Sequence, residues 1–183
     1  MNSPKVDRLT AKVDENSAIC PERCDGLEQY TRRNTLELHG VPMTRGESTN
    51  DIAIDIFQAM GVDVTYADIC RSHRNFTRRR RGNRNLPPII LVKLIRHDIK
   101  QIIYDNREVL RYLPGYRNIY VNENLTKSRR KLYGRVRTHF PHFKCTTNDG
   151  KIYLSGTNFN GGKKYRINCT KDYQALLEMR FSP

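Results

Sequence analysis

The sequence predicts an α+β fold, because the hydrophobic periodicity changes several times between two residues and about 3.6 residues. The stretch "TLELHGV" (35–41) alternates like a strand, "PPIILVKLI" (87–95) is a short apolar run like a buried strand, and amphipathic segments follow both. The 183 residues suffice for one ordinary domain or two small ones. We expect an N-terminal arm or coiled-coil remnant (1–24), a first domain (25–122) and a small α/β domain (123–183).

The first predicted strand places Leu36 and Leu38 on one face and Thr35, Glu37 and His39 on the other. A helix follows in "ESTNDIAIDIFQAMGV", where Ser48 resembles a capping residue three positions before Asp51. Its core face is expected to carry Ile52, Ile56 and Met60.

A weaker strand, "DVTYADICRSH", and the central strand should follow, the latter with Ile90, Val92 and Leu94 inward. A second helix is expected to be capped around Asp98 and Gln101. Its core side would carry Ile99, Ile102, Ile103 and Leu110, and the last strand, "RNIYVNENL", would turn Ile119 and Val121 inward. The order βαββαβ is the ferredoxin-like arrangement, which RNA-recognition modules share.

The C-terminal domain begins with a predicted helix in "LTKSRRKLYGRVRTHF", with Thr126 as its cap. One line of this helix is apolar, and Lys127, Lys131 and Arg135 form an opposite, basic line. The apolar line consists of Leu125, Leu132, Val136 and Phe140. A hairpin turning at Asn148-Asp149-Gly150, the strand "KYRINC" and the helix "KDYQALLEM" complete the domain.

The charge of the chain favours a polyanionic partner, since 33 Lys and Arg against 19 Asp and Glu give a net charge of +14. Arginine suits phosphate because its planar fork donates two parallel hydrogen bonds. Three basic clusters are the candidate contacts: Arg32 and Arg33; Arg71, Arg74, Arg78, Arg79, Arg80 and Arg81 within 71–84; and Lys127, Arg129, Arg130, Lys131, Arg135 and Arg137. The consecutive arginines 78–81 lie in a predicted loop that would gather nucleic acid by charge or serve as a nuclear address.

The predicted first sheet lacks the aromatic residues with which RNA-recognition modules stack on bases. Glu37, Ile89 and Leu91 occupy those positions, and His39 and Tyr120 are the remaining candidates. We expect these two side chains to cover the sheet rather than to stack, because aromatic platforms usually come in sets.

Other classes of protein receive little support. No apolar stretch approaches the ~20 residues of a membrane span, and the N-terminus lacks the order of a secretory signal, so we expect no membrane contact and an intracellular, reducing location. The Cys and His spacings match no structural zinc pattern, and no catalytic motif is present. We therefore expect no metal, no cofactor and no enzymatic activity.

Five ordered segments, "LEQYTRRNTLELHGVP", "DICRSHR", "PPIILVKL", "IYVNENLT" and "NDGKIYL", give the chain a family resemblance from about Asp25 to Leu177. It resembles the first open reading frame protein of LINE-type retrotransposons, which is related to the baculovirus few-polyhedra protein. The resemblance implies an RNA-recognition-like domain and a C-terminal domain that together coat element RNA, without sequence specificity, as a nucleic-acid chaperone. It also implies self-association through an N-terminal coiled coil, for which residues 1–24 offer only Val6, Leu9 and Val13 before Pro21.

Carried over residue by residue, the resemblance adds Tyr30 and Lys93 to the candidate contacts and supports Arg32, Arg33, Arg71, Arg74, Lys127, Arg129 and Arg130. The expected partner is single-stranded RNA or DNA, and the sequence does not choose between them. The expected location is a cytoplasmic ribonucleoprotein, with the nucleus as a second option. The alternative is a protein-interaction or assembly module whose charge serves solubility.

Overall fold

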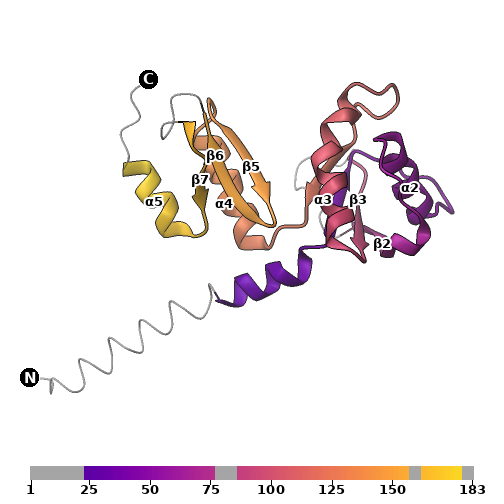
Figure 1. Cartoon of the computed structure of the whole chain (residues 1–183), viewed down its shortest axis with the longest axis horizontal. Coiled ribbons are helices and arrows are strands. Elements are labelled where there is room, and N and C mark those ends of the chain that lie inside the picture. The colour runs from indigo at the N-terminus through magenta and orange to yellow at the C-terminus, as the bar shows by residue number, and fades with distance from the viewer. Residues whose placement is uncertain (1–22, 77–85, 157–161, 179–183) are drawn as a thin grey trace, which may run out of the picture. The chain divides into compact units, whose positions relative to one another are not determined.

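The computed structural model describes residues 23–76, 86–156 and 162–178, which fall into two compact units. The first unit is Arg33–Asn124, and the second joins Met1–Arg32 to Leu125–Pro183. Figure 1 labels the helices and strands of both. The expected boundary at residue 25 differs from this division, because residues 23–32 form a helix that groups with the C-terminal residues.

The first unit is built around a four-stranded antiparallel sheet in the order β2-β3-β1-β4. Along the chain its elements are β1 (Thr35–His39), α2 (Thr49–Ala59), the 3-10 helix η1 (Tyr66–Asp68), β2 (Ile69–Asn75), β3 (Ile89–Leu94), α3 (His97–Asn106), the 3-10 helix η3 (Arg107–Arg111) and β4 (Tyr120–Glu123). The α+β class expected from the sequence is thereby confirmed.

One face of this sheet carries the core. Leu36 lies opposite Val92, and Leu38 lies opposite Ile90 and Val121, all five being buried. Both α2 and α3 pack on this face, with Ala53, Ile56, Phe57, Ile99 and Ile103 in the same apolar cluster. The predicted inward orientation of β3 is confirmed, and Ser48 caps α2 by accepting a hydrogen bond from the Asp51 amide at 3.3 Å.

Two predictions for α3 are wrong. The helix begins at His97 with Arg96 as its cap and no side-chain capping bond, and Gln101 instead bonds Asp105 at 3.1 Å. Ile102 is 49% exposed, whereas Lys100 is fully buried. The reason lies on β4, where Glu123 pairs with the core residue Leu36 and accepts a hydrogen bond from the Lys100 ammonium at 2.6 Å. A paired lysine can occupy a core position that its sequence pattern assigns to solvent.

Two element boundaries also differ from the expected ones. Residues 66–68, expected within the weak strand, form η1, and β2 starts only at Ile69. Leu110 is buried as predicted but belongs to η3 rather than to α3. Both differences occur at element ends, where a single capping interaction, such as the Thr65 amide bonding Asp68 at 3.0 Å, decides the conformation.

The second unit contains α4 (Lys127–His139), β5 (Lys144–Asn148), β6 (Lys151–Ser155), β7 (Tyr165–Ile167) and α5 (Thr170–Glu178). Its three strands form an antiparallel sheet in the order β5-β6-β7. Both helices pack on one face of this sheet through a cluster whose buried members are Leu132, Val136, Phe140, Ile152, Leu154, Ile167, Tyr173 and Leu176. Of the predicted apolar line, Leu132, Val136 and Phe140 lie in this cluster, whereas Leu125 is buried outside it, before α4 begins.

The β5-β6 turn shows why its sequence is Asp-Gly. Asp149 and Gly150 have φ values of 49° and 72°, the left-handed pair that a two-residue hairpin turn requires. A Cβ on Gly150 would also lie 2.4 Å from the Gln29 Cγ of the helical segment 23–32, so any other residue here would force the Gln29 side chain to move. None of the helices among the described residues is long and apolar enough to span a bilayer.

Candidate nucleic-acid interface

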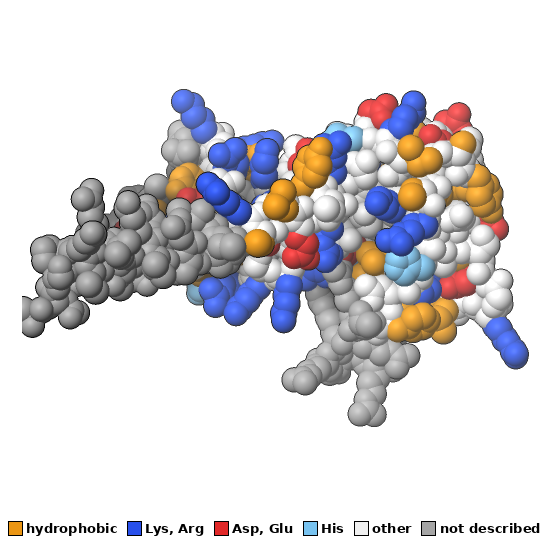
Figure 2. Space-filling model, turned by 90° about the horizontal axis from the view of Figure 1, so that it is seen from below, with side chains coloured by type: hydrophobic (Ala, Val, Ile, Leu, Met, Phe, Trp, Pro, Cys, Tyr) orange, Lys and Arg blue, Asp and Glu red, His pale blue; other side chains and the backbone are white. Residues whose placement is uncertain are grey.

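The excess positive charge is concentrated toward the C-terminus. Residues 125–183 contain thirteen Lys and Arg and only three acidic residues, Asp149, Asp172 and Glu178, whereas residues 33–124 contain fifteen and ten. Figure 2 shows Lys and Arg side chains projecting from the surface of the second unit in several places. A surface of one sign raises the local concentration of polyanions.

Helix α4 presents the most regular basic surface. Lys127, Lys131 and Arg135 are exposed, as predicted, while Leu132 and Val136 on the opposite side are buried. Residues four apart on a helix have Cβ atoms ~6 Å apart, so the three cations form a row along the helix axis. Arg137 is also exposed, and its guanidinium lies 5.6 Å from the centre of the Tyr133 ring. We call Lys127, Lys131 and Arg135 the α4 basic row.

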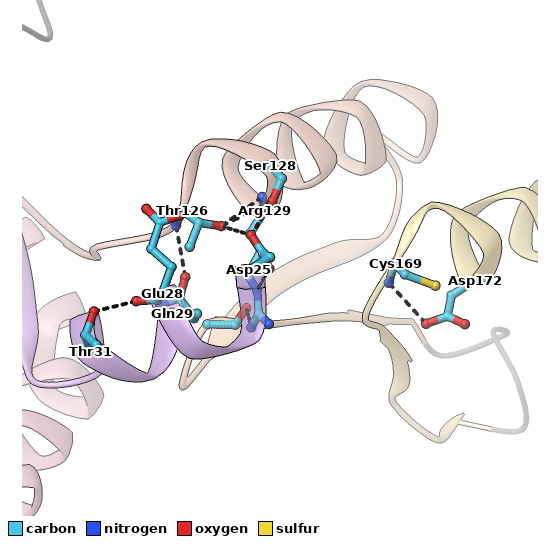
Figure 3. A network of polar contacts seen from close by, with 10 residues as sticks. Asp25, Glu28, Gln29, Thr31, Thr126, Ser128, Arg129, Cys169 and Asp172 are labelled. Carbon is cyan, nitrogen blue, oxygen red and sulfur yellow. Dashed lines mark hydrogen bonds and ion pairs between the residues drawn. The ribbon is translucent and has the colours of Figure 1, made fainter. Parts of the chain in front are cut away.

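The N-terminus of α4 is held by the helical segment 23–32 (Figure 3). Asp25 accepts hydrogen bonds from the hydroxyls of Thr126, at 2.6 Å, and Ser128, and the Gln29 side-chain oxygen accepts from the Thr126 amide at 2.9 Å. Since α4 has no acidic residue in its own first turn, Asp25 supplies the negative charge that a helix N-terminus favours.

Arg129 belongs to the same contact. Its Nε donates to Asp25 at 2.7 Å and one terminal nitrogen donates to the Gly150 carbonyl at 3.0 Å, leaving the side chain 19% exposed. Burial raises the pKa of Asp25, but the hydrogen bonds from Ser128, Thr126 and Arg129 outweigh it and hold the pKa below its ordinary value. Arg129, expected to bind phosphate, therefore joins the segments of the second unit.

Arg74 departs from the expectation in the same way. Its guanidinium donates to both carboxylate oxygens of Glu47, at 2.7 and 2.8 Å, and to the carbonyls of Val41, Pro42 and Pro88. With its side chain 5% exposed, it ties β2 to the segment before α2 and to the residue preceding β3. These bonds hold the pKa of Glu47 below its usual range. A guanidinium with all its bonds inside the fold cannot also serve as an outward phosphate contact.

Two further predicted contacts of the first unit, Arg71 and Lys93, lie on the sheet face opposite the core. Arg71 and Lys93 are directly paired between β2 and β3, with Arg71 exposed and Lys93 half-buried. The same face carries His39, whose Nε2 lies 3.2 Å from the Glu37 carboxylate, beside a 52% exposed Tyr120. Glu37 itself is 2% exposed, so this face contains a buried carboxylate as well as cations.

The first basic cluster lies where the helical segment 23–32 ends. Tyr30 is 62% exposed, and Arg32 forms an ion pair at 2.6 Å with Glu28 one turn earlier. Arg33 is exposed in the turn before β1.

The remaining candidates belong to the other two basic clusters. Arg130 is half-buried and donates to the Leu125 carbonyl at 3.2 Å. Arg78, Arg79, Arg80 and Arg81 fall outside the described residues.

Sequence reasoning missed the acidic partners that select among the arginines. Asp25 and Glu47 drew no attention because each bonds an arginine far away in the sequence, at separations of 104 and 27 residues. Of the described candidates, the α4 basic row, Tyr30, Arg33, Arg71 and Arg137 are exposed.

Comparison with known proteins adds no assignment. No protein-family model matches the chain, and no curated protein matches it either. Within residues 23–76, 86–156 and 162–178, no cluster of three or more His, Cys, Asp or Glu side chains is placed to hold a metal ion.

Proposed function

We propose that this protein binds single-stranded nucleic acid, RNA or DNA, through electrostatic contacts that do not read sequence. The observation that carries the proposal is the α4 basic row, three exposed cations on one helix face, within a segment of thirteen basic and three acidic residues. Flexible single strands can follow such a row with successive phosphates, and no base edge needs to be recognised.

The strand order of the first unit supports a further part of the proposal. A βαββαβ chain with the sheet order β2-β3-β1-β4 fits the split βαβ, RNA-recognition-like arrangement expected from the sequence. In this proposal the first unit is an RNA-recognition-like module without the usual aromatic platform, and Arg71 and Lys93 are its cationic contacts. Coating of element RNA in an intracellular retrotransposon ribonucleoprotein, with chaperone activity, is the role that the family resemblance suggests, and no catalysis is part of it.

The test is a binding titration of a fluorescent 20-nucleotide single strand at several salt concentrations. Each phosphate contact to a single strand contributes about 0.7 to the slope of log K against log salt. Replacing the α4 basic row in K127A/K131A/R135A should therefore lower the slope by about 2 and weaken binding to all sequences alike.

The matched control is R45A/R111A/R117A, which removes the same charge from exposed positions of the first unit. We expect it to change the slope by less than about 1, because cations that contact no phosphate release no counterions when the strand binds. Equal losses from both triple variants would show that only net charge matters and would reject the α4 basic row as the contact. A wild-type protein that does not bind the strand at low salt would reject the function itself.

A further inference from the structure

The second unit has a sheet face that none of the predicted contacts uses. In β6, Ile152 and Leu154 point to the helices, so Lys151, Tyr153 and Ser155 point to the opposite face. The register assigns their neighbours, because Tyr153 pairs with Thr146 on β5 and with Arg166 on β7. We call this surface the outer face of the second sheet.

Cations surround the tyrosine on this face. Arg166 is directly across from Tyr153, where Cβ atoms lie ~5 Å apart, and Lys151 is two residues along the same strand, ~7 Å away. Lys144 pairs with Ser155 and is thus a diagonal neighbour of Tyr153. Lys144, Lys151 and Arg166 are exposed, and Tyr153 is partly exposed.

The composition of the outer face differs from that of an ordinary solvated sheet. Exposed antiparallel faces usually carry both signs of charge, since opposite charges across strands stabilise the pairing and like charges destabilise it. Here the outward-facing positions of β5, β6 and β7 contain three cations, one tyrosine and small polar residues, and no carboxylate. A central aromatic ring among cations, without an acidic neighbour on the strands, complements a nucleic-acid base flanked by its phosphates.

We propose that the outer face of the second sheet is a second contact surface for single-stranded nucleic acid, where a base stacks on Tyr153 and phosphates bind Lys144, Lys151 and Arg166. This inference rests on the proposed function and adds to it a stacking contact that the first sheet lacks. It also places a contact on strands, in addition to the α4 basic row, which lies on a helix.

The experiment compares two probes of equal charge, a fluorescent 20-nucleotide oligothymidylate and an abasic 20-mer of the same backbone. Base–aromatic stacking of ~1–3 kcal/mol predicts that Y153T weakens oligothymidylate binding about 5- to 150-fold and leaves abasic binding unchanged within about twofold. Threonine suits an exposed strand position, and Y153F, which retains the ring, should bind both probes like wild type. The variant K144T/K151T/R166T should weaken both probes and lower the salt slope by about 2.

Separate outcomes distinguish this proposal from the proposed function. If wild type binds the oligothymidylate and K127A/K131A/R135A weakens it, but Y153T and K144T/K151T/R166T do not, the outer face is not a contact and the proposed function stands. Equal losses in Y153T and Y153F would overturn stacking, because the hydroxyl would then be the group that matters. Binding of anionic phosphatidylserine vesicles that K144T/K151T/R166T abolishes, with oligothymidylate binding intact, would assign the face to lipid and also overturn the proposal. Circular dichroism and thermal melting verify that each variant is folded.

Discussion

The Asp25–Arg129 pair gives the sharpest test of whether this arginine stabilises the fold or binds nucleic acid. The two side chains meet at 2.7 Å with 19% and 20% of their areas exposed, so a charge-assisted hydrogen bond of about 2 kcal/mol is expected. D25A also removes the acceptor for the hydroxyls of Thr126 and Ser128. We expect D25A and R129A each to lower the free energy of unfolding of the second unit by about 2–3 kcal/mol.

The assay is a double-mutant cycle in urea, monitored by circular dichroism. Because both substitutions break the same contact, D25A/R129A should be only slightly less stable than either single variant, which gives a coupling free energy of about 2 kcal/mol. Loss of the Asp25–Arg129 contact should lower the melting temperature by about 8–24 °C in a unit of this size.

Nucleic-acid binding provides the second measurement of the cycle. Under our reasoning R129A, measured where it is still folded, changes the salt slope by less than about 0.7, whereas K131A lowers it by about that amount. Additive stability losses, with a coupling free energy below about 0.5 kcal/mol, would refute a stabilising contact between Asp25 and Arg129. A slope loss in R129A as large as that in K131A would return Arg129 to the contact surface.

Three further predictions concern stability. R74M should destabilise the first unit by about 3 kcal/mol or more in urea denaturation, because the Glu47 carboxylate loses its cation. R74K should not restore this stability, since lysine lacks the planar fork that bonds both Glu47 oxygens and three backbone carbonyls. K100M should cost about 3–5 kcal/mol by leaving Glu123 buried without its cation, whereas K100M/E123L should recover most of that loss; equal losses would contradict a paired buried charge. Folding lowers the pKa values of Asp25 and Glu47, so the unfolded chain binds protons more readily than the folded one. The stability that these carboxylates contribute is therefore complete above about pH 5 and falls as the pH drops toward 3. In thermal melts, D25N/E47Q should be less stable than wild type at pH 7 and should lose less stability in acid.

The local sequence pattern was sufficient to predict features that lie within a single helix, strand or turn. The α4 basic row, the cap at Thr126, the inward face of β3 and the hairpin turn at 148–150 were predicted and are confirmed. Each follows from helical or strand periodicity, from a capping side chain three residues away, or from the positive φ that a short turn needs. Such signals lie within a few residues of one another, so the sequence contains them complete.

Only the tertiary structure decided which basic residues are exposed to a ligand and which are buried in ion pairs. Arg74, Arg129 and Lys100 resemble the exposed basic residues in sequence, and their acidic partners lie 27, 104 and 23 residues away. Folding brings each pair together, because a cation that is withdrawn from water must be paired. The paired cation is then largely buried and no longer faces the solvent. The register of β5, β6 and β7 likewise gathers Tyr153, Lys144 and Arg166 on one face from three separate strands, which no local periodicity reveals.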